Sequence, residues 1–568
     1  MTGTAIGGAI FGLNYAQPQP IEPIASSVTE PVASTVKEPS KKPDKKPAEQ
    51  ALTIFPRRLL VVSVNNYLYA NPVQYGFRIG EVDRTTLSLV ARLASWLHID
   101  RSQWILVSDS APPGQSRPTI RPVIEHAIRS FLQTSRSQDR VILMFIGHAV
   151  VIGGTPYLVP MEGELDRQET LIPLAWVYEQ LAECKARQKV LWLDVCRFDP
   201  SQGMERPGSG PMSAELDAAL QHPPEGIQVV THCVKDQFSY ELTTRGNIGG
   251  VVLNQVMSLR EQANDKPTDP LPLEQLVQVL GSLAEKEVQL YLKREQTMRL
   301  TGTEAPSASA FDPLQPPPPP LVPPEVPVPE GGLANLEDVR QLLDQIDLPP
   351  LRPSFDQGGT LRAEAMPPLS RRVLAAYATE ADTPLRRATQ AAIEVLRRRS
   401  AAFPDTFAVP VGEENRFKQM IADIQKDRMK GPAVAQLELE EALQALEEAG
   451  KQRDREPHKR TQANYDYVLG RLKARIAFVY EHNYMLGSLR KGLPPRDPLI
   501  HTGWRLAAQE RMQSGVEARK LVREAHEVFT RLAKEHPGTP WEVLGKRERL
   551  TALGLYWEPI SVVEERKP

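Results

Sequence analysis

Lys189-Val190-Leu191-Trp192-Leu193-Asp194-Val195-Cys196-Arg197 is an apolar run that ends on an acid, a thiol and a guanidinium. A continuous run of aliphatic and β-branched residues is typical of a parallel strand that is buried on both faces. Polar residues at the carboxyl end of such a strand lie where open α/β sheets place their ligands. The sequence therefore predicts a buried strand that presents Asp194 and Cys196 at a ligand-binding edge.

A second run has the same design and ends on a histidine. Arg140-Val141-Ile142-Leu143-Met144-Phe145-Ile146 leads directly into Gly147-His148-Ala149. Because the carboxyl ends of parallel strands meet at one edge of a sheet, we expect His148 and Cys196 to lie near each other. A buried structural thiol and a satisfied loop histidine are the commoner explanations of either residue alone. As a pair, however, they form the minimum arrangement for nucleophilic catalysis by a thiol.

The composition bounds the class of protein. A chain of 568 residues is too long for one core and predicts two or three domains. The net charge of −2, from 68 basic and 70 acidic residues, provides no field that would favour nucleic acid. Three cysteines cannot build a disulfide framework, which favours a reducing, cytoplasmic compartment. No apolar run approaches the roughly 18 residues of a transmembrane segment.

Two stretches of biased composition divide the chain. Residues 1–52 read as a disordered leader and a Pro/Lys-rich linker, and residues 304–370 as a Pro-rich linker. The leader contains a mildly apolar segment at 5–13 without a preceding Lys or Arg. Export or a membrane tether through this segment is therefore the alternative to a cytoplasmic location.

Residues 53–303 alternate between strand and helix patterns, which predicts an α/β domain with a mostly parallel sheet flanked by helices. Asp83 is placed at the start of the first helix, where a carboxylate caps exposed N–H groups. The expected strands are at 59–64, 104–107, 140–146, 189–194 and 227–232, and the expected helices at 83–97, 118–132, 174–184, 249–259 and 271–293.

Residues 371–568 are predicted to be all α-helical and to bind a protein partner. The final pair of helices, separated by 536–540, loosely resembles a terminal tetratricopeptide hairpin, but no 34-residue period runs through the region. Helical periodicity is found at 373–396, 417–424, 433–446, 463–489 and 504–533.

Residues 57–303 resemble the peptidase domain of the caspase superfamily, and its metacaspase and bacterial caspase-like branches more than the animal caspases. His148 precedes Cys196 by roughly 50 residues, as the catalytic His does in that family. The resemblance rests on Asn65-Asn66-Tyr67, Asp83, Ile146-Gly147-His148-Ala149, Tyr157-Leu158-Val159-Pro160, Leu193-Asp194-Val195-Cys196-Arg197, Ser239-Tyr240-Glu241, Gly249-Gly250-Val251-Val252-Leu253 and Gln296-Thr297.

The resemblance implies a cysteine endopeptidase acting on polypeptides. Cys196 would be the nucleophile and His148 the general base, with an oxyanion hole from the N–H groups of Ala149 and Cys196. In metacaspases the positions of Asp83 and Asp194 line the pocket that selects Arg or Lys in the substrate. Calcium activates many metacaspases, although no loop with alternating oxygen ligands is readable in this sequence.

Three departures from the family favour an alternative, in which the domain is catalytically degraded and acts as a scaffold or regulatory protein. Ile146 replaces a Ser, Ala149 replaces a Gly, and Phe198 replaces a smaller residue near the nucleophile. His232 and Cys233 lie near Asp236, but the spacing of a four-ligand zinc site is absent, and we expect no metal.

Overall fold

The computed structural model describes residues 57–73, 77–79, 82–84, 86–109, 118–245, 250–262, 273–303, 383–399, 406–408, 430–489 and 499–561, with residues 419, 422, 493, 494 and 497. The expected leader and Pro-rich linker lie outside these residues, as does nearly all of the helix expected at 417–424. Among the described residues, no helix combines the length and apolar character needed to cross a bilayer.

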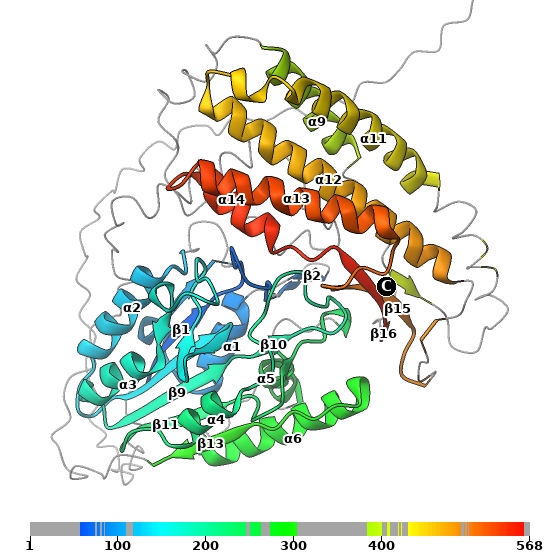
Figure 1. Ribbon diagram of the computed structural model, residues 1–568. Coiled ribbons are helices and arrows are strands. Elements are labelled where there is room, and N and C mark those ends of the chain that lie inside the picture. The colour runs from blue at the N-terminus through cyan, green and yellow to red at the C-terminus, as the bar shows by residue number, and fades with distance from the viewer. Residues whose placement is uncertain are drawn as a thin grey trace, which may run out of the picture. The chain divides into compact units, whose positions relative to one another are not determined.

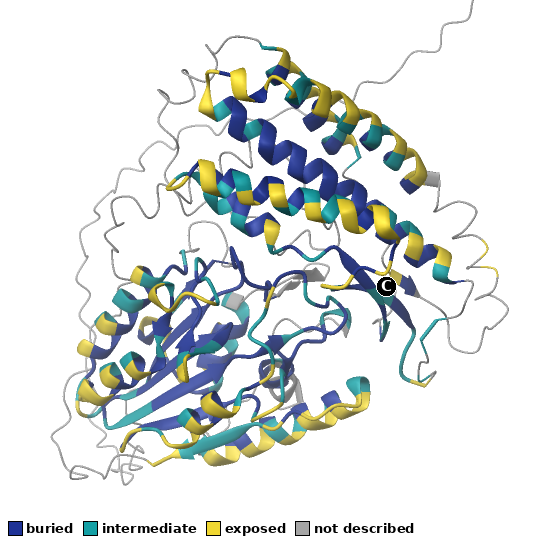
Figure 2. Ribbon diagram, in the orientation of Figure 1, coloured by how far each residue is buried: buried dark blue, intermediate teal, exposed yellow. Residues whose placement is uncertain are grey.

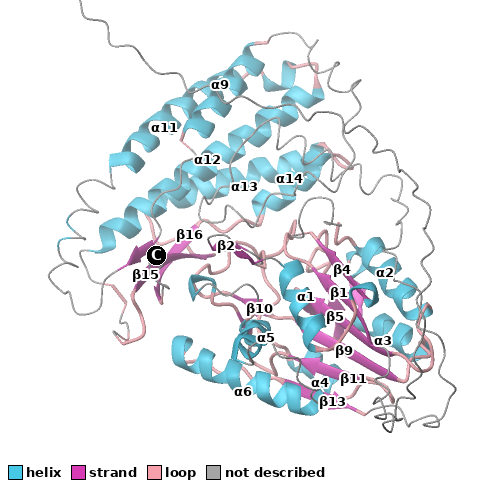
Figure 3. Ribbon diagram, turned by 180° about the vertical axis from the view of Figure 1, so that it is seen from behind, coloured by secondary structure: helices cyan, strands magenta, loops and turns pink. Residues whose placement is uncertain are grey.

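A mostly parallel six-stranded sheet forms the centre of residues 57–303, as predicted (Figures 1 and 3). Its middle strands are buried along nearly their whole length because their residues are almost all aliphatic. β13 pairs antiparallel with β11 at one edge, and the other pairings are parallel. The spatial order is β13 (Arg299–Gly302), β11 (Gln228–Thr231), β9 (Gln188–Asp194), β5 (Arg140–Ile146), β1 (Arg57–Ser63) and β4 (Trp104–Ser108).

Helices flank this sheet, and α1 and α6 both contact α5, while α2 contacts α3. α4 begins at a capped end, because the Ser213 hydroxyl accepts a hydrogen bond from the Leu216 N–H. The helices are α1 (Thr86–Trp96), α2 (Arg121–Gln133), α3 (Leu174–Glu183), α4 (Ala214–Gln221), α5 (Val251–Gln262) and α6 (Leu273–Leu292).

Small sheets of two or three strands accompany the main sheet. The two short strands that follow the loops of His148 and Cys196 belong to these sheets, so both residues lie at a change of chain direction. The small sheets are β2 (Phe77–Ile79) with β3 (Val82–Arg84), β6 (Ala149–Ile152) with β7 (Thr155–Leu158) and β8 (Ile172–Pro173), and β10 (Arg197–Phe198) with β12 (Ser239–Tyr240).

The C-terminal region is not all-α, and the prediction was wrong on this point. Its strands β14 (Thr406–Ala408), β15 (Gly503–Gln509) and β16 (Gly554–Ile560) form an antiparallel sheet. The periodicity at 504–533 predicted one helix, but β15 occupies its first part because β16 supplies a long pairing partner. The helices are α9 (Pro384–Arg398), α11 (Lys430–Gly450), α12 (Lys459–Ser488), α13 (Val516–Glu535) and α14 (Pro540–Arg549).

α12 is the central helix of this region. It contacts α9, α11, α13 and α14, and it is buried over most of its length (Figure 2). A helix that is buried all round must satisfy its polar residues within the protein.

Candidate active site at the carboxyl end of the sheet

Cys196 lies at a sharp turn that separates two strands. β9 ends at Asp194 and β10 begins at Arg197, so the chain leaves the main sheet at Cys196. The backbone of Cys196 has φ +59°, a left-handed conformation that costs a non-glycine residue about 1–2 kcal/mol. The side chain is buried, and the carbonyl of Cys196 accepts a hydrogen bond from the Ser239 N–H at 3.0 Å. Such strain is concentrated at functional sites.

Gly147 brings the end of β5 against β9. Its N–H donates to the carbonyl of Asp194 at 3.0 Å, which continues the β5–β9 pairing beyond Ile146. Gly147 has φ +155°, and a Cβ atom there would lie 2.2 Å from the hydroxyl oxygen of Tyr67. That hydroxyl in turn accepts a hydrogen bond from the His148 N–H at 2.8 Å. Only glycine allows this close approach, which fixes the backbone of His148.

The imidazole of His148 is held in one tautomer. Its Nε2 lies 2.6 Å from the carbonyl oxygen of Asn71, which can only accept, so Nε2 carries the proton. Nδ1 is then the basic nitrogen, and it accepts a hydrogen bond from the Ser209 hydroxyl at 3.0 Å. Burial lowers the pKa of His148 to about 4, and the charge of Arg197 lowers it further, although the Asn71 carbonyl opposes the shift. His148 is therefore neutral near pH 7, with both ring nitrogens engaged by groups other than Cys196.

Asp194 is fully buried and bound to groups of this chain. Its carboxylate accepts hydrogen bonds from the Arg197 guanidinium and from the Ser239 hydroxyl, the latter at 2.6 Å. His232 Nδ1 lies 3.0 Å from the same carboxylate, and His232 Nε2 accepts from Trp192 Nε1–H at 2.6 Å. Burial alone raises the pKa of Asp194, but Arg197 and His232 together hold it well below its usual range.

Arg197 joins Asp194 to a second buried acid. Its Nη2 lies 3.0 Å from a carboxylate oxygen of Glu241. Burial raises the pKa of Glu241 to about 7 against the lowering effect of the Arg197 charge. We call Asp194, Arg197 and Glu241 the buried charge cluster; with both acids ionised it carries one net negative charge.

Asp83 does not open the first helix, and that expectation was wrong. It lies in β3 opposite Arg78 of β2, and α1 begins at Thr86. The hairpin explains the difference, because pairing with β2 holds the backbone of Asp83 in an extended conformation. The side chain of Asp83 lies outside the described part of the chain, so its predicted role in substrate binding stays a prediction.

Ala149, Ile146 and Phe198, the three positions that depart from the family pattern, are buried or partly buried. Ala149 is buried at the start of β6 opposite Leu158, and its backbone is not left-handed, so the strain that a left-handed alanine would carry is absent. Ile146 is buried in β5. Phe198 packs on Phe238, with ring centroids 4.9 Å apart.

Sequence reasoning missed three residues that hold the site. Asp109, after β4, accepts the backbone N–H groups of Asn65 and Asn66 at 3.0 and 2.7 Å and so anchors the loop that leads to Tyr67. Asn71 and Ser209 bind the two imidazole nitrogens of His148. The motif Asn65-Asn66-Tyr67 indicated the first loop, but nothing in the local sequence indicated Ser209.

Hydrogen bonds join the segment that carries Ser209 to the loop after β1. The side-chain oxygen of Asn71 accepts a hydrogen bond from the Glu205 N–H at 2.8 Å. The N–H of Asn71 donates to the carbonyl of Pro207 at 2.8 Å, and Arg206 Nε donates to the carbonyl of Ala70 at 2.9 Å. Residues 205–209 are thereby held beside His148.

The same segment also pairs with β15. The N–H of Met204 donates to the carbonyl of Ala508 at 2.9 Å, and the N–H of Ala508 donates to the carbonyl of Gln202 at 2.8 Å. Gly203 has φ +73°, and a Cβ atom there would lie 2.2 Å from the Ala508 oxygen. Residues 202–204 therefore continue the edge of the C-terminal sheet, and glycine at 203 permits it.

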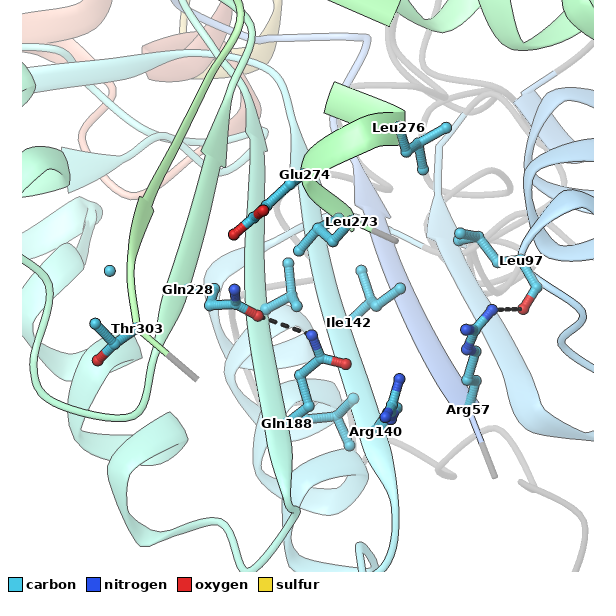
Figure 4. Close-up of a pocket in the computed structure, with 13 residues that line it drawn as sticks. Arg57, Leu97, Arg140, Ile142, Gln188, Gln228, Leu273, Glu274, Leu276 and Thr303 are labelled. Carbon is cyan, nitrogen blue, oxygen red and sulfur yellow. Dashed lines mark hydrogen bonds between the residues drawn. The ribbon is translucent and has the colours of Figure 1, made fainter. Parts of the chain in front are cut away.

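A separate cavity of about 680 Å³ lies at the amino end of the strands, away from Cys196 (Figure 4). Arg57 and Arg140 border it together with the amides of Gln188 and Gln228, which hydrogen-bond to each other at 2.8 Å. Leu273, at the start of α6, contributes to the apolar wall. This cavity contains none of the predicted catalytic residues.

One group of three potential metal-ligating side chains occurs among the described residues, in the C-terminal region. Asp466, Glu535 and His536 place ligand atoms within 4.8 Å of one another. Arg453 bridges Asp466 and Glu535, and Arg531 also binds Asp466 at 2.6 Å. Because two guanidinium groups already neutralise these acids, the cluster fits an ion-pair network better than a metal site.

No protein-family model matches the sequence, and no curated protein sequence matches it.

Proposed function

We propose that residues 57–303 form a caspase-like cysteine endopeptidase domain, with Cys196 as nucleophile and His148 as base. The observation that carries the proposal is the strained, left-handed Cys196 just beyond the end of β9, next to β5, which leads to His148. A structural thiol has no need of such a backbone, whereas a nucleophile at a sharp turn is exposed to an incoming carbonyl group once the covering segment moves.

The tautomer of His148 supports one route for the proton. The Asn71 carbonyl keeps the proton of His148 on Nε2, so Nδ1 accepts the proton of the Cys196 thiol and later passes it to the leaving amine. Ser209 occupies Nδ1, and the structure therefore corresponds to a resting state of the proposed enzyme. Activity requires Ser209 to leave Nδ1 so that the thiol can approach it.

Cleavage after Arg or Lys is supported by the acidic character of the buried charge cluster. Asp194 already binds Arg197, so a basic substrate side chain must share or replace that contact. The additional acid, Glu241, gives the cluster its net negative charge once it is ionised.

The test is cleavage of fluorogenic peptides ending in Arg, Lys or Asp by the full chain, with and without calcium. We expect cleavage after Arg or Lys, and its loss in Cys196→Ala and in His148→Ala. Cys184→Ala is the matched control, because this thiol is also buried but lies at the end of α3 beside Leu132. Cleavage after Asp would preserve the peptidase and refute the assignment of Asp194.

A scaffold without catalysis is the second candidate, and a specific observation favours it. Both nitrogens of His148 are engaged and Cys196 is 1% exposed. The two candidates differ in thiol reactivity. A peptidase that opens reacts with iodoacetamide at Cys196 faster than at Cys184 near pH 7, while a scaffold alkylates both slowly. No cleavage together with equal, slow alkylation would refute the peptidase and leave the scaffold as the better proposal.

A further inference from the structure

Cys233 lies next to the proposed nucleophile because of the strand register. β11 pairs in parallel with β9, and Thr231 lies opposite Leu193. The pairing continues past the strand, since the His232 N–H donates to the carbonyl of Leu193 at 3.3 Å. The Cys233 thiol then donates to the carbonyl of Val195 at 3.7 Å. Cys233 is thus beside the residue that precedes Cys196.

The two thiols are neighbours that interact. The interaction with Cys196 is the largest contribution to the raised pKa of Cys233, and both side chains are buried. Neighbouring strands lie about 4.8 Å apart, and a disulfide requires Cα atoms about 4.4–6.8 Å apart. The register places Cys233 opposite Val195, so we expect the Cα atoms of Cys233 and Cys196 to lie within this range without a rearrangement of the sheet. The third cysteine, Cys184, is bound to the carbonyl of Leu132 on the helical layer.

We propose that Cys196 and Cys233 form a reversible disulfide when a hydroperoxide oxidises Cys196, and that this modification switches the site off. The inactivation rests on the proposed peptidase function, but the disulfide itself does not. The disulfide would stop the proposed catalysis, because the sulfur of Cys196 is the proposed nucleophile.

The chemistry balances with the hydroperoxide as the two-electron oxidant. The Cys196 thiolate attacks one peroxide oxygen, the O–O bond breaks, and the departing oxygen takes a proton as water or an alcohol. The sulfur of Cys233 then attacks the sulfur of the Cys196 sulfenic acid. An S–S bond forms, the S–O bond breaks, and the hydroxide leaves with the proton of Cys233 as water. A dithiol reductant reverses the bond by exchange.

Electrostatics assigns the two thiols to different steps. The hydrogen bond with Cys196, and then burial, raise the pKa of Cys233 well above its usual range. Cys233 therefore remains a neutral thiol while Cys196 is reduced, and it does not compete for the hydroperoxide.

The experiment treats the reduced full chain with hydrogen peroxide, the smallest hydroperoxide, and then labels it with N-ethylmaleimide after denaturation. The chain has three thiols and no disulfide. We expect intact-mass analysis to show the loss of two hydrogen atoms and a fall from three labels to one, restored to three by dithiothreitol. Peptide mapping should place the link between Cys196 and Cys233.

Two variants make the result decisive. Cys184→Ala leaves both thiols in place and should fall from two labels to none on oxidation. In Cys233→Ala, Cys196 should be trapped by dimedone or oxidised beyond rescue by dithiothreitol. Three labels after oxidation, or a link through Cys184, would overturn the inference. If the disulfide forms but the reduced chain cleaves no peptide, the proposed modification stands and the peptidase is refuted. If the reduced chain cleaves peptides but no disulfide forms, the peptidase stands and the modification is refuted.

Discussion

The carboxyl end of the parallel sheet and the buried helix α12 both hold charged groups away from water, but they arrange them differently. At the sheet end, Asp194, Arg197 and Glu241 are crowded beside a strained thiol, and an excess of acid remains. Along α12, the buried charges of Asp466, Arg471 and Lys473 are spread over the helix, and each faces an oppositely charged partner on a neighbouring element. Those pairs are Asp466 with Arg453 and Arg531, Arg471 with Glu548, and Lys473 with Glu447 and Glu524.

The charged pairs along α12 determine packing, whereas the charged groups at the sheet end are available for chemistry. A distributed set of pairs fixes the register of α12 against α11, α13 and α14, and its loss is felt as lost stability. Charged groups that are crowded at a strand end, where the chain turns away from the sheet, can respond to a ligand, to pH or to an oxidant. Burial alone does not distinguish the two regions.

The largest effect on stability is expected along α12. Asp466→Ala leaves Arg453 and Arg531 without their shared buried partner and should lower the free energy of unfolding by about 3–5 kcal/mol in urea titration. Glu448→Ala removes an exposed pair with Lys451 and should change it by no more than about 0.5 kcal/mol. Equal effects of the two variants would contradict the packing role of Asp466.

A smaller, pH-dependent effect is expected from Glu241. Its pKa of about 7 in the folded state lies above the ordinary value of 4.5, so the folded protein binds this proton more tightly than the unfolded chain. Stability must then fall as the pH rises from about 4.5 to 7. Glu241→Gln should remove this loss, so the stability of the wild type relative to the variant falls by about 2–3 kcal/mol between pH 5 and 8. Parallel stability curves for the two proteins would show that the carboxyl group does not titrate there.

The smallest change in stability, about 1 kcal/mol or less, is expected for Ser209→Ala. It removes the hydroxyl that donates to Nδ1 of His148, and we expect alkylation of Cys196 near pH 7 to become several-fold faster. Ser213→Ala removes the cap of α4 at similar cost but should leave the alkylation rate unchanged. If both variants alkylate at the wild-type rate, Ser209 does not guard the site.

The fold of the parallel sheet was readable because its strands carry their own pattern. Val141 to Ile146 and Val190 to Leu193 are continuous apolar runs, and they correctly place His148 and Cys196 just beyond the ends of adjacent strands. β15 was missed because Trp504, Leu506, Ala507 and Ala508 fit either a helix or a strand, and the pairing with β16 decides between them. That choice depends on residues about 50 positions away, which a local pattern does not contain.

The sequence pattern predicted the candidate reactive residues, but it did not predict the side chains that restrain them. Asp194 and Cys196 follow from the strand pattern, but the occupation of Asp194 by His232 and Ser239 depends on which strands become neighbours. Ser209 reaches His148 because Asn71 holds the segment before it, and such loop contacts leave no periodic trace in a sequence.

The pairing of residues 202–204 with β15 also has a mechanical consequence. The amide hydrogens of Met204 and Ala508 are protected by the same short ladder, so local opening of either should expose both to exchange. A fragment ending near residue 303 would leave the edge at Gly203 without its partner. Residues 202–204, which follow the proposed nucleophile, therefore belong to a sheet that is complete only when β16 has been added. We expect the two regions to unfold together, so experiments need the full chain.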